Sequence, residues 1–275
     1  MRHESHLEAG AGGGSRYVQS WRPQGAARAA LVLLHGLAEH SDRYGELVAR
    51  LVDLKIAVHA LDHRGHGRSA GPRANIGRFA WLVEDAAARL AAARAEEPRR
   101  PLLLLGHSLG GAVALATALQ HRVDALILSA PAVGADPHPP WARLAIARLL
   151  SALAPSVGVL TLPSDALSRD PEVGRRYDAD PLVYRGAIPA RSIIELLDAM
   201  RDLRARAPLL RAPVLVMHGT ADRLVPLANC EPVYERLGSP DRTLLRFEGF
   251  YHELFNDPER ARVFEALAAW IGRRL

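Results

Sequence analysis

The 275-residue sequence contains a single cysteine, Cys230, and a single lysine, Lys55. With one cysteine no internal disulfide can form, which fits a reducing compartment, and we interpret the thiol as a half-exposed structural residue. No apolar run reaches the roughly 18 residues that a membrane-spanning helix needs. Residues 1–17, MRHESHLEAGAGGGSRY, lack the apolar core of a secretory signal. The sequence therefore predicts a cytoplasmic protein that does not cross a membrane.

The chain also lacks a concentration of charge of one sign. It has 35 Lys and Arg against 30 Asp and Glu, and only 5% of its residues are aromatic. The arginines are spread from Arg2 to Arg274, many of them near an acidic residue on an expected helix. Nucleic-acid-binding proteins gather basic residues on one face with aromatic residues between them, so we expect no nucleic-acid partner. The net charge of +5 is compatible with weak attraction to an anionic lipid surface.

What the sequence does contain is an alternation of short apolar runs with segments of helical spacing, typical of buried parallel strands and their connecting helices. This alternation stops between 134 and 190, where prolines are frequent and no clear strand is visible, and then resumes. We expect an α/β fold with a mostly parallel central sheet and helices on both faces, built by residues 1–133 and 191–275, with a cap inserted at 134–190. The expected strands lie within 29–36, 56–67, 101–106, 123–131, 213–222 and 243–249, and the expected helices within 41–55, 78–97, 109–121, 192–206, 230–238 and from 258 onward.

The N-terminal part carries two more expectations. A flexible glycine-rich lead is followed by RYVQSW at 16–21, whose alternation is typical of an edge strand. Ser41 stands just before a helical pattern, where a side-chain cap is expected.

The segment Gly106-His107-Ser108-Leu109-Gly110 fits the pattern G-x-S-x-G between an apolar run and a helical pattern. A strand-to-helix turn this sharp forces the serine into a strained backbone conformation and leaves room only for glycine on either side. The serine hydroxyl then stands at a helix N-terminus, where the N–H of Leu109 can stabilise an oxyanion. A plain glycine-rich turn with an incidental serine is the simpler alternative.

A serine needs a base and an orienting acid before it can act as a nucleophile. In this kind of fold the chain order is serine, acid, histidine, each after a strand. Asp222 follows the run VLVMHGTA, and His252 follows the last expected strand; among the twelve histidines His252 alone comes after Asp222. We therefore predict that Ser108 attacks, His252 transfers the proton and Asp222 orients the imidazole.

The loop after the first buried run, at His35-Gly36, is expected to provide the second oxyanion donor, the N–H of Leu37. His63 and His66 lie close together, but no third ligand stands at a suitable spacing. We expect them to take part in a structural hydrogen-bond network, and we expect no metal and no cofactor.

Five segments, HGLAEHSDRY, DHRGHGRSAGPR, GHSLGG, HGTADRLVP and YHELFND, together resemble the monoacylglycerol lipase family of the α/β-hydrolase superfamily. The resemblance runs from about Trp21 to Trp270 and includes LSRDPEVGRRYDADPLVYR in the insertion. It implies that Glu39 and Arg43 lie at the polar end of the site and that Tyr177 faces the glycerol moiety. From the residues alone, Glu39 and Arg43 can equally form a plain ion pair, and Tyr177 can equally be cap core.

The segment WARLAIARLLSALAP, residues 141–155, is apolar nearly all round and too short to cross a bilayer. It fits either a helix buried against the core or a lid that contacts a lipid surface. The motifs predict a serine hydrolase that acts through an acyl-enzyme. The family resemblance implies that its substrate is a small lipid ester, monoacylglycerol, which is cleaved to fatty acid and glycerol. Lysophospholipase or broad carboxylesterase activity is the alternative, because Arg169, Arg175 and Arg176 could accept a phosphate head group. A catalytically idle lipid-binding module would need none of the three triad residues.

Overall fold

The computed structural model describes residues 1–135 and 141–275. Its central sheet has eight strands in the order β1-β2-β4-β3-β5-β6-β9-β10. The pairs β1–β2 and β2–β4 are antiparallel, and all other neighbours are parallel. The strands are β1 Arg2–Ala9, β2 Ser15–Arg22, β3 Ala29–Leu34, β4 Ile56–Leu61, β5 Leu102–His107, β6 Ala125–Ser129, β9 Val214–Gly219 and β10 Arg242–Phe247.

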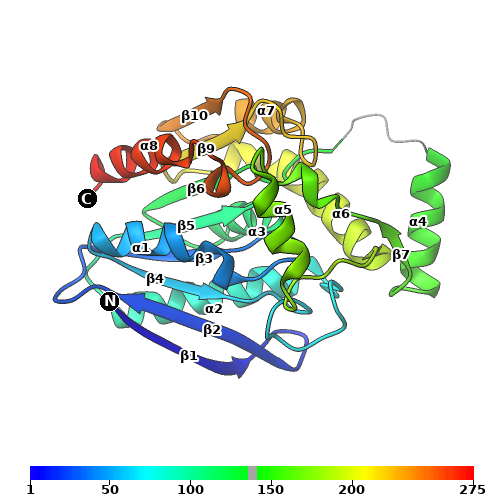
Figure 1. Ribbon diagram of the computed structural model, residues 1–275, viewed down its shortest axis with the longest axis horizontal. Helices are drawn as coiled ribbons and strands as arrows, with labels where there is room; N and C mark the ends of the chain where they lie inside the picture. Colours follow the sequence, from blue (N-terminus) through cyan, green and yellow to red (C-terminus); the bar gives the residue numbers. More distant parts are fainter. Residues whose placement is uncertain (136–140) are drawn as a thin grey trace.

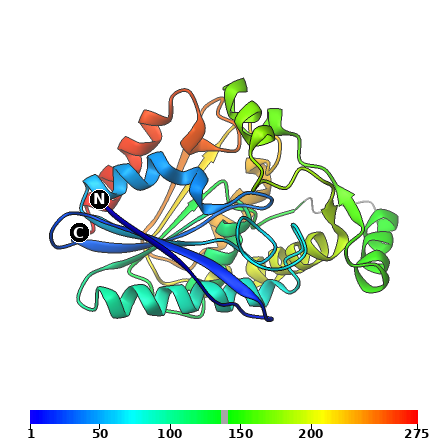
Figure 2. The same cartoon turned by 60° about the horizontal axis from the view of Figure 1, so that its bottom comes forward.

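Helices cover both faces of this sheet (Figure 2). The helices α1 (Gly45–Asp53) and α8 (Arg260–Gly272) pack on one face, and α2 (Phe79–Glu96), α3 (Leu109–Ala118), α6 (Ala190–Arg206) and α7 (Leu227–Arg236) contribute side chains to the core on the other. Because both faces are covered, β3, β4, β5, β6 and β9 are buried at every position, which is why they read as continuous apolar runs. The predicted fold class is confirmed.

The N-terminal segment differs from the prediction. It is not a flexible lead: residues 2–9 form β1, which is paired with β2 along its whole length and makes the edge of the sheet. Gly12, Gly13 and Gly14 have φ values of 68°, 87° and 86°, so the glycines that suggested flexibility build a tight hairpin turn. Residues 16–21 belong to a strand that has a neighbour on each side.

The segment at 134–190 contains α4 (Trp141–Leu153), β7 (Gly158–Leu160), a 3-10 turn (Ser164–Ala166), α5 (Pro171–Ala179) and β8 (Ile188–Pro189). The strands β7 and β8 pair in a small antiparallel sheet, so the expectation that this segment has no strand is wrong. Both strands are short, three and two residues, and β7 is exposed throughout, which explains why they leave no sequence pattern. Figure 1 shows these elements over the carboxyl ends of the parallel strands.

Backbone hydrogen bonds attach the inner half of this segment to the loops beneath it. The N–H of Tyr184 donates to the carbonyl of Ala38 at 2.9 Å, and the N–H of Glu253 donates to the carbonyl of Leu167 at 2.7 Å. The guanidinium of Arg169 adds an ion pair with Asp257 at 2.6 Å. These contacts hold α5 close to the carboxyl edge of the sheet.

Two smaller details complete the fold. Ser41 begins a 3-10 turn (Ser41–Tyr44) and does not cap α1; its hydroxyl donates to the Asp62 carboxylate at 2.6 Å instead. Within the described part of the chain, no helix is both long and apolar enough to cross a membrane.

Candidate active site

Ser108 stands at the turn between β5 and α3 with φ 51° and ψ −118°, a conformation that a residue with a side chain rarely adopts. The flanking glycines explain how the turn is possible. A Cβ on Gly106 would lie 2.1 Å from the carbonyl oxygen of Gly110, and a Cβ on Gly110 would lie 2.2 Å from the carbonyl oxygen of Leu34. The backbone is therefore too close at both positions for any other residue, and this close packing holds the serine at the N-terminus of α3.

Asp222 and His252 come from the loops after β9 and β10, and they meet. The Nδ1 of His252 lies 2.7 Å from Oδ2 of Asp222, and both residues are buried. The other carboxylate oxygen of Asp222 accepts from the backbone N–H groups of Leu224 and Val225, each at 2.9 Å. These bonds leave the carboxylate little freedom to rotate, so it fixes the direction of the imidazole ring.

The charge of this carboxylate is stabilised by its surroundings. Burial by itself would raise the pKa of Asp222, but hydrogen bonds from His218 and His252 outweigh burial and bring the pKa below its usual range. His218 lies within 3.4 Å of Asp222 and also bonds to the carbonyl of Val225 at 2.8 Å. Asp222 is thus ionised at neutral pH and able to stabilise a positive charge on His252.

The two predicted oxyanion donors lie beside the serine. Gly36 is close enough to Ser108 that a Cβ on it would be 3.3 Å from the serine Cβ, which places the loop after β3 against the elbow. Leu37 follows in this loop, Leu109 follows Ser108, and both line the same cavity. The carboxylate of Glu39 accepts the N–H of Gly36 at 2.6 Å and so helps to fix the loop.

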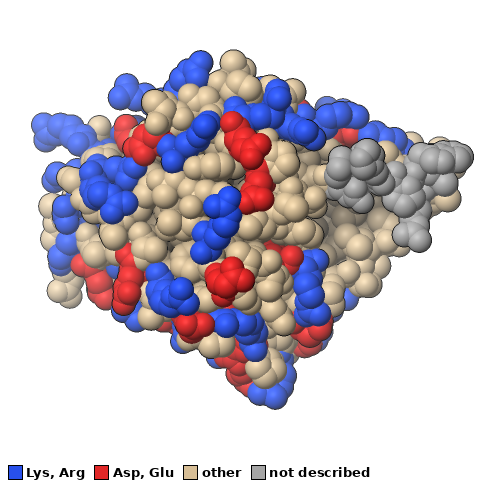
Figure 3. All heavy atoms as spheres, turned by 90° about the horizontal axis from the view of Figure 1, so that it is seen from above, with Lys and Arg blue, Asp and Glu red and all other residues tan. Residues whose placement is uncertain are grey.

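Ser108 and His252 line one cavity whose other walls are mostly apolar and come from both the core and the segment above it. Figure 3 shows basic and acidic side chains interleaved over one face of the molecule, with a hollow on the side of the inserted segment where the visible surface is uncharged. The apolar lining residues are Leu37, Leu109, Ala132, Leu160, Leu162, Leu167, Ile193, Leu196, Leu197, Met200, Leu224 and Val225.

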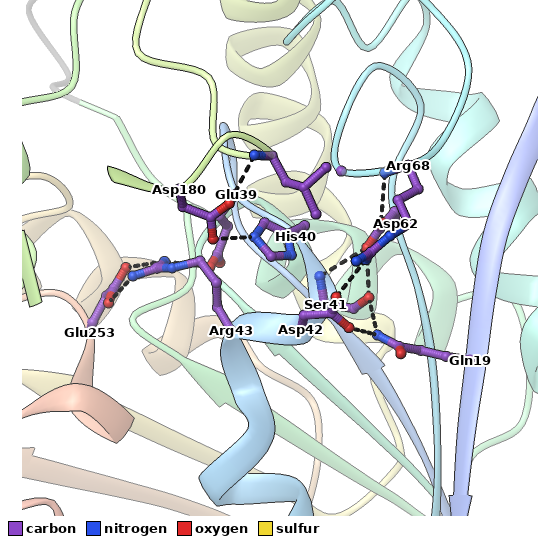
Figure 4. A network of polar contacts seen from close by, with 12 residues as sticks. Gln19, Glu39, His40, Ser41, Asp42, Arg43, Asp62, Arg68, Asp180 and Glu253 are labelled. Carbon is purple, nitrogen blue, oxygen red and sulfur yellow. Dashed lines mark hydrogen bonds and ion pairs between the residues drawn. The ribbon is translucent and has the colours of Figure 1, made fainter. Parts of the chain in front are cut away.

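The polar end of the cavity contains Glu39, Arg43, Tyr177 and Glu253. Figure 4 shows the guanidinium of Arg43 directed at the carboxylate of Glu253. Arg43 donates to Glu39 at 2.7 Å and makes a two-pronged contact with Glu253 at 2.6 and 2.9 Å. The guanidinium carbon lies 4.9 Å from the centre of the Tyr177 ring. The ion pair between Glu39 and Arg43 is present, and both side chains also line the cavity, so the ion pair leaves open the predicted place of these residues at the polar end of the site. Tyr177 is likewise both buried in a small apolar cluster and exposed to the cavity.

Sequence reasoning missed Glu253 and His107, although each is adjacent in sequence to a predicted catalytic residue. Glu253 is buried; burial would raise its pKa, and the charge of Arg43 lowers it below the ordinary value. His107 lies with its ring centre 4.7 Å from that of His252. Burial, and then the nearby His252, lower the pKa of His107 to about 3, so the ring is neutral. Because Nδ1 lies 3.1 Å from the carbonyl of Ser129, which can only accept, Nδ1 carries the proton and donates it.

His35, His63 and His66 form a buried group at the loop after β3. The Nε2 of His35 accepts the backbone N–H of His63 at 2.9 Å, which leaves Nδ1 to donate to the carbonyl of Gly36 at 2.7 Å. Burial lowers the pKa of His63 to about 3 and that of His66 to about 4, so both are neutral. Across the described ranges, no group of three or more His, Cys, Asp or Glu side chains has an arrangement that could hold a metal ion.

The prediction for Cys230 was wrong, because its thiol is buried in α7. Burial raises the pKa of this thiol to about 12, so it stays protonated and unreactive at neutral pH. No strong signal was available from the sequence, since polar and apolar residues are mixed along this helix and do not show which face the cysteine occupies.

With this geometry established, comparison with known proteins is informative. The family described as serine aminopeptidase, S33, matches residues 25–259. Monoacylglycerol lipase of Mycolicibacterium smegmatis is 39% identical over 97% of this chain and 96% of its own length. Human monoglyceride lipase is 33% identical over 94% of this chain and 87% of its own length. The crystal structure of Paleococcus ferrophilus monoacylglycerol lipase, 32% identical, has a TM-score of 0.83 over 94% of this chain and 99% of that one.

The family match spans most of the chain, and the first two relatives are more than 30% identical and are covered over most of their length. The resemblance inferred from the sequence motifs is therefore confirmed. The chain belongs to the monoglyceride lipase family of α/β hydrolases.

Proposed function

We propose that this protein is a serine ester hydrolase that cleaves monoacylglycerols into fatty acid and glycerol through an acyl-enzyme. The observation that carries the proposal is the meeting of three features at one cavity: the strained Ser108, the hydrogen-bonded pair of Asp222 and His252, and a long apolar wall. Relatives named monoacylglycerol lipase and monoglyceride lipase, which match nearly the whole chain, support this substrate class.

The proton of the His252 ring lies on Nδ1, facing Asp222, so Nε2 is free to accept the proton of Ser108. The serine oxygen then bonds to the ester carbonyl carbon, and the carbonyl oxygen becomes an oxyanion. The N–H groups of Leu37 and Leu109 stabilise that charge. When the carbon–oxygen bond to glycerol breaks, His252 returns the proton to the leaving alkoxide, and a water molecule later releases the fatty acid by the same sequence of steps.

The glycerol moiety fits the polar end of the cavity. One oxygen of the Glu39 carboxylate is already occupied by the N–H of Gly36 and the hydroxyl of Tyr44, both at 2.6 Å, and the other by Arg43. Glu39 therefore acts mainly by holding the oxyanion loop, and the glycerol hydroxyls meet the side chains of Arg43, Tyr177 and Glu253. The acyl chain lies along the apolar wall, where each buried methylene contributes roughly 0.8 kcal/mol.

The outer part of the cap supports peripheral contact with a lipid surface. On α4 the side chains of Ile146, Leu149 and Leu153 are 59%, 58% and 77% exposed. Leu160 on β7 is 46% exposed and also lines the cavity, so apolar surface continues from the outside of the cap into the site. A monoacylglycerol leaving a lipid layer through this opening would keep its acyl chain in apolar surroundings throughout.

The alternative activity, lysophospholipase, is less well supported by the cap arginines that suggested it. Arg169 is paired with Asp257 and Glu259, and Arg175 with Glu172. Both guanidinium groups point to neighbouring carboxylates, and neither Arg169, Arg175 nor Arg176 lines the cavity. A phosphate head group would thus meet Glu39 and Glu253, and Arg43 is the one basic side chain to balance them among the described residues that line the cavity.

The experiment that tests the proposal compares kcat/KM for four esters with the same acyl chain: monoacylglycerol, diacylglycerol, lysophosphatidylcholine and a methyl ester. We expect monoacylglycerol to be preferred by at least about tenfold, because only its head group fits the polar end of the cavity. Comparable rates on all four would contradict recognition of glycerol and would indicate a general esterase. A preference for lysophosphatidylcholine would favour the alternative.

A further inference from the structure

Strand β1 lies at one edge of the sheet. Among the described residues β2 is the one strand that pairs with it. Seven of its eight residues are exposed, and Glu8 is half-buried. It forms the lower margin of the molecule in Figure 1, whereas the inserted segment with α4, α5 and β7 lies on the right. A long open strand edge presents unpaired backbone groups and is a natural site for pairing with another strand.

Three hydrogen bonds show which backbone groups of β1 point outward. At the end of the hairpin the N–H of Gly10 donates to the carbonyl of Gly14 at 2.9 Å. Because bonded and non-bonded positions alternate along an antiparallel pair, the even-numbered residues of β1 bond to β2 and the odd-numbered ones do not. Independently, Tyr17, the partner of Leu7, directs its N–H and carbonyl away from β1, to Ser69 and Asp62. The N–H and carbonyl groups of His3, Ser5 and Leu7 therefore face outward.

The sequence of β1, RHESHLEA, is complementary to itself when two copies run antiparallel. With a two-fold axis at Ser5, Glu4 of one copy lies opposite His6 of the other, and Arg2 opposite Glu8. The outward-facing residues then pair as His3 with Leu7 and Ser5 with Ser5, which satisfies six backbone groups on each strand. Arg2 and Glu8 carry unlike charges, and the ring of His6 can donate a hydrogen bond to the carboxylate of Glu4, so both kinds of pair stabilise this arrangement.

Moving the axis by one residue loses this complementarity. A two-fold axis at Glu4 places Glu4 opposite its own copy, and an axis at His6 places Glu4 opposite Glu8. An axis between two residues would set outward-facing groups against groups already bonded to β2. Axes at His3 and at Leu7 keep the pairs Arg2–Glu4 and His6–Glu8, but they leave fewer residues paired. The axis at Ser5 therefore combines complementary pairs with the longest overlap of the two strands.

We propose that two copies of this chain pair through β1, antiparallel about a two-fold axis at Ser5, and form one sheet that continues across the dimer. Within the strand Glu4 contacts Arg2 and His6 contacts Glu8. Both contacts are solvent-exposed and therefore weak, so Glu4 and His6 can exchange these partners for those of a second copy. Glu8 already receives an ion pair from Arg16 at 2.8 Å, so the Glu4–His6 contacts are the more specific ones. Because the interface consists of one strand from each copy, we expect a concentration-dependent dimer rather than a permanent one.

Analytical ultracentrifugation over a concentration series tests the proposal on the full-length protein. We expect Glu4→Arg and His6→Glu each to weaken the dimer on the order of tenfold, since the first removes the acceptor of the His6 ring and the second sets two carboxylates opposite one another. The double variant restores the unlike pair, so its dissociation constant should return to within about threefold of the wild-type value. Unchanged activity on a soluble short-chain ester shows that the variants are folded.

A cross-linking experiment locates the axis. Ser5→Cys places two thiols opposite each other in the proposed register, and mild oxidation should give a disulfide-linked dimer. Ser156→Cys, at an exposed position of the cap, is the matched control, and Cys230 is buried in both variants. A monomer at every concentration, or cross-linking of Ser5→Cys no greater than that of the control, would overturn the proposal. So would a dimer that the Glu4 and His6 variants leave unchanged.

Discussion

The guanidinium of Arg43 binds both carboxylate oxygens of Glu253, at 2.6 and 2.9 Å, although 210 residues separate the two in sequence. Arg43 also binds Glu39, whose carboxylate fixes the N–H of Gly36. This chain of contacts joins the oxyanion loop to the loop that carries His252. The loop with the proposed oxyanion donor Leu37 and the loop with the proposed base His252 are therefore held relative to one another by one half-buried cation.

Replacing Glu253 by Gln should weaken the connection between these two loops without removing a catalytic group. One charged contact of Arg43 becomes a weaker neutral one, so His252 and the loop of Leu37 lose part of their alignment. We expect kcat on monoacylglycerol to fall by about tenfold to a hundredfold, since small misplacements of catalytic groups are costly. Glu259→Gln, which alters an exposed partner of Arg169, is the control and should keep wild-type kinetics. Equal kinetics for the two variants would refute this role of Glu253.

Asp222→Asn tests the orientation of the imidazole. The amide can no longer accept from Nδ1 of His252 as the carboxylate does, so the ring takes the wrong tautomer and the positive charge in the transition state is unsupported. We expect kcat to fall about 10⁴-fold with little change in the melting temperature. Asp165→Asn, at an exposed ion pair with Arg223, should have no effect on kcat. A loss below tenfold for Asp222→Asn would argue against its assignment.

The buried histidines predict how stability depends on pH. The pKa of His63 in the folded protein is about 3, against about 6.5 when unfolded, so the unfolded chain binds a proton first as the pH falls. Stability is full above pH 6.5 and decreases below it, by about 2 kcal/mol per such histidine at pH 5. Urea unfolding at pH 7.5 and 5.0 measures this difference. Burial also lowers the pKa of His35, His59, His66 and His107, which therefore add to the same pH dependence.

His63→Leu is the matched variant, because neither ring nitrogen of His63 has a hydrogen-bond partner among the described residues. The difference in unfolding free energy between pH 7.5 and 5.0 should shrink by about 2 kcal/mol in this variant. A pH dependence identical to that of the wild type would mean that His63 is protonated in the folded state.

The exposed face of α4 should matter only when the substrate is in a lipid layer. Changing Ile146 and Leu149 to Ser removes apolar surface that lies outside the core, so the fold is unaffected. We expect activity on monoacylglycerol in vesicles to fall severalfold, while activity on a soluble short-chain ester stays within about twofold. Equal losses on both substrates would indicate a purely structural helix. Arg201→Ser, on the exposed side of the neighbouring α6, serves as the control.

Much of the fold was predictable, because buried parallel strands and their helices leave strong apolar patterns. The segments around Leu102–His107 and Val214–Gly219 are buried on both faces, and their sequences show it directly. The strand β1 was missed because RHESHLEA is exposed on both faces and has almost no apolar residue to mark it. Ser41 was predicted to cap a helix, but its hydroxyl donates to Asp62 instead. This partner is 21 residues away in sequence, and no local pattern reveals it.

The site was predictable to the extent that its residues follow strands in a fixed order. Ser108, Asp222 and His252 each stand just after a strand, and the structure brings Asp222 into contact with His252 and places Ser108 at the same cavity. Glu253 left no such signal, because a glutamate before a helix is common and its partner Arg43 lies far away in sequence. Long-range ion pairs of this kind depend on the packing of loops, which the sequence does not display.

The most direct test of the account is the rate of monoacylglycerol hydrolysis by Ser108→Ala, measured beside the wild type at matched protein concentration. The substitution removes one oxygen atom from a position whose backbone is set by its neighbours, so circular dichroism and melting temperature should be unchanged. We predict that turnover falls by a factor on the order of 10⁶. A folded Ser108→Ala variant that still releases glycerol at a rate near that of the wild type would contradict the assignment of Ser108 as the nucleophile.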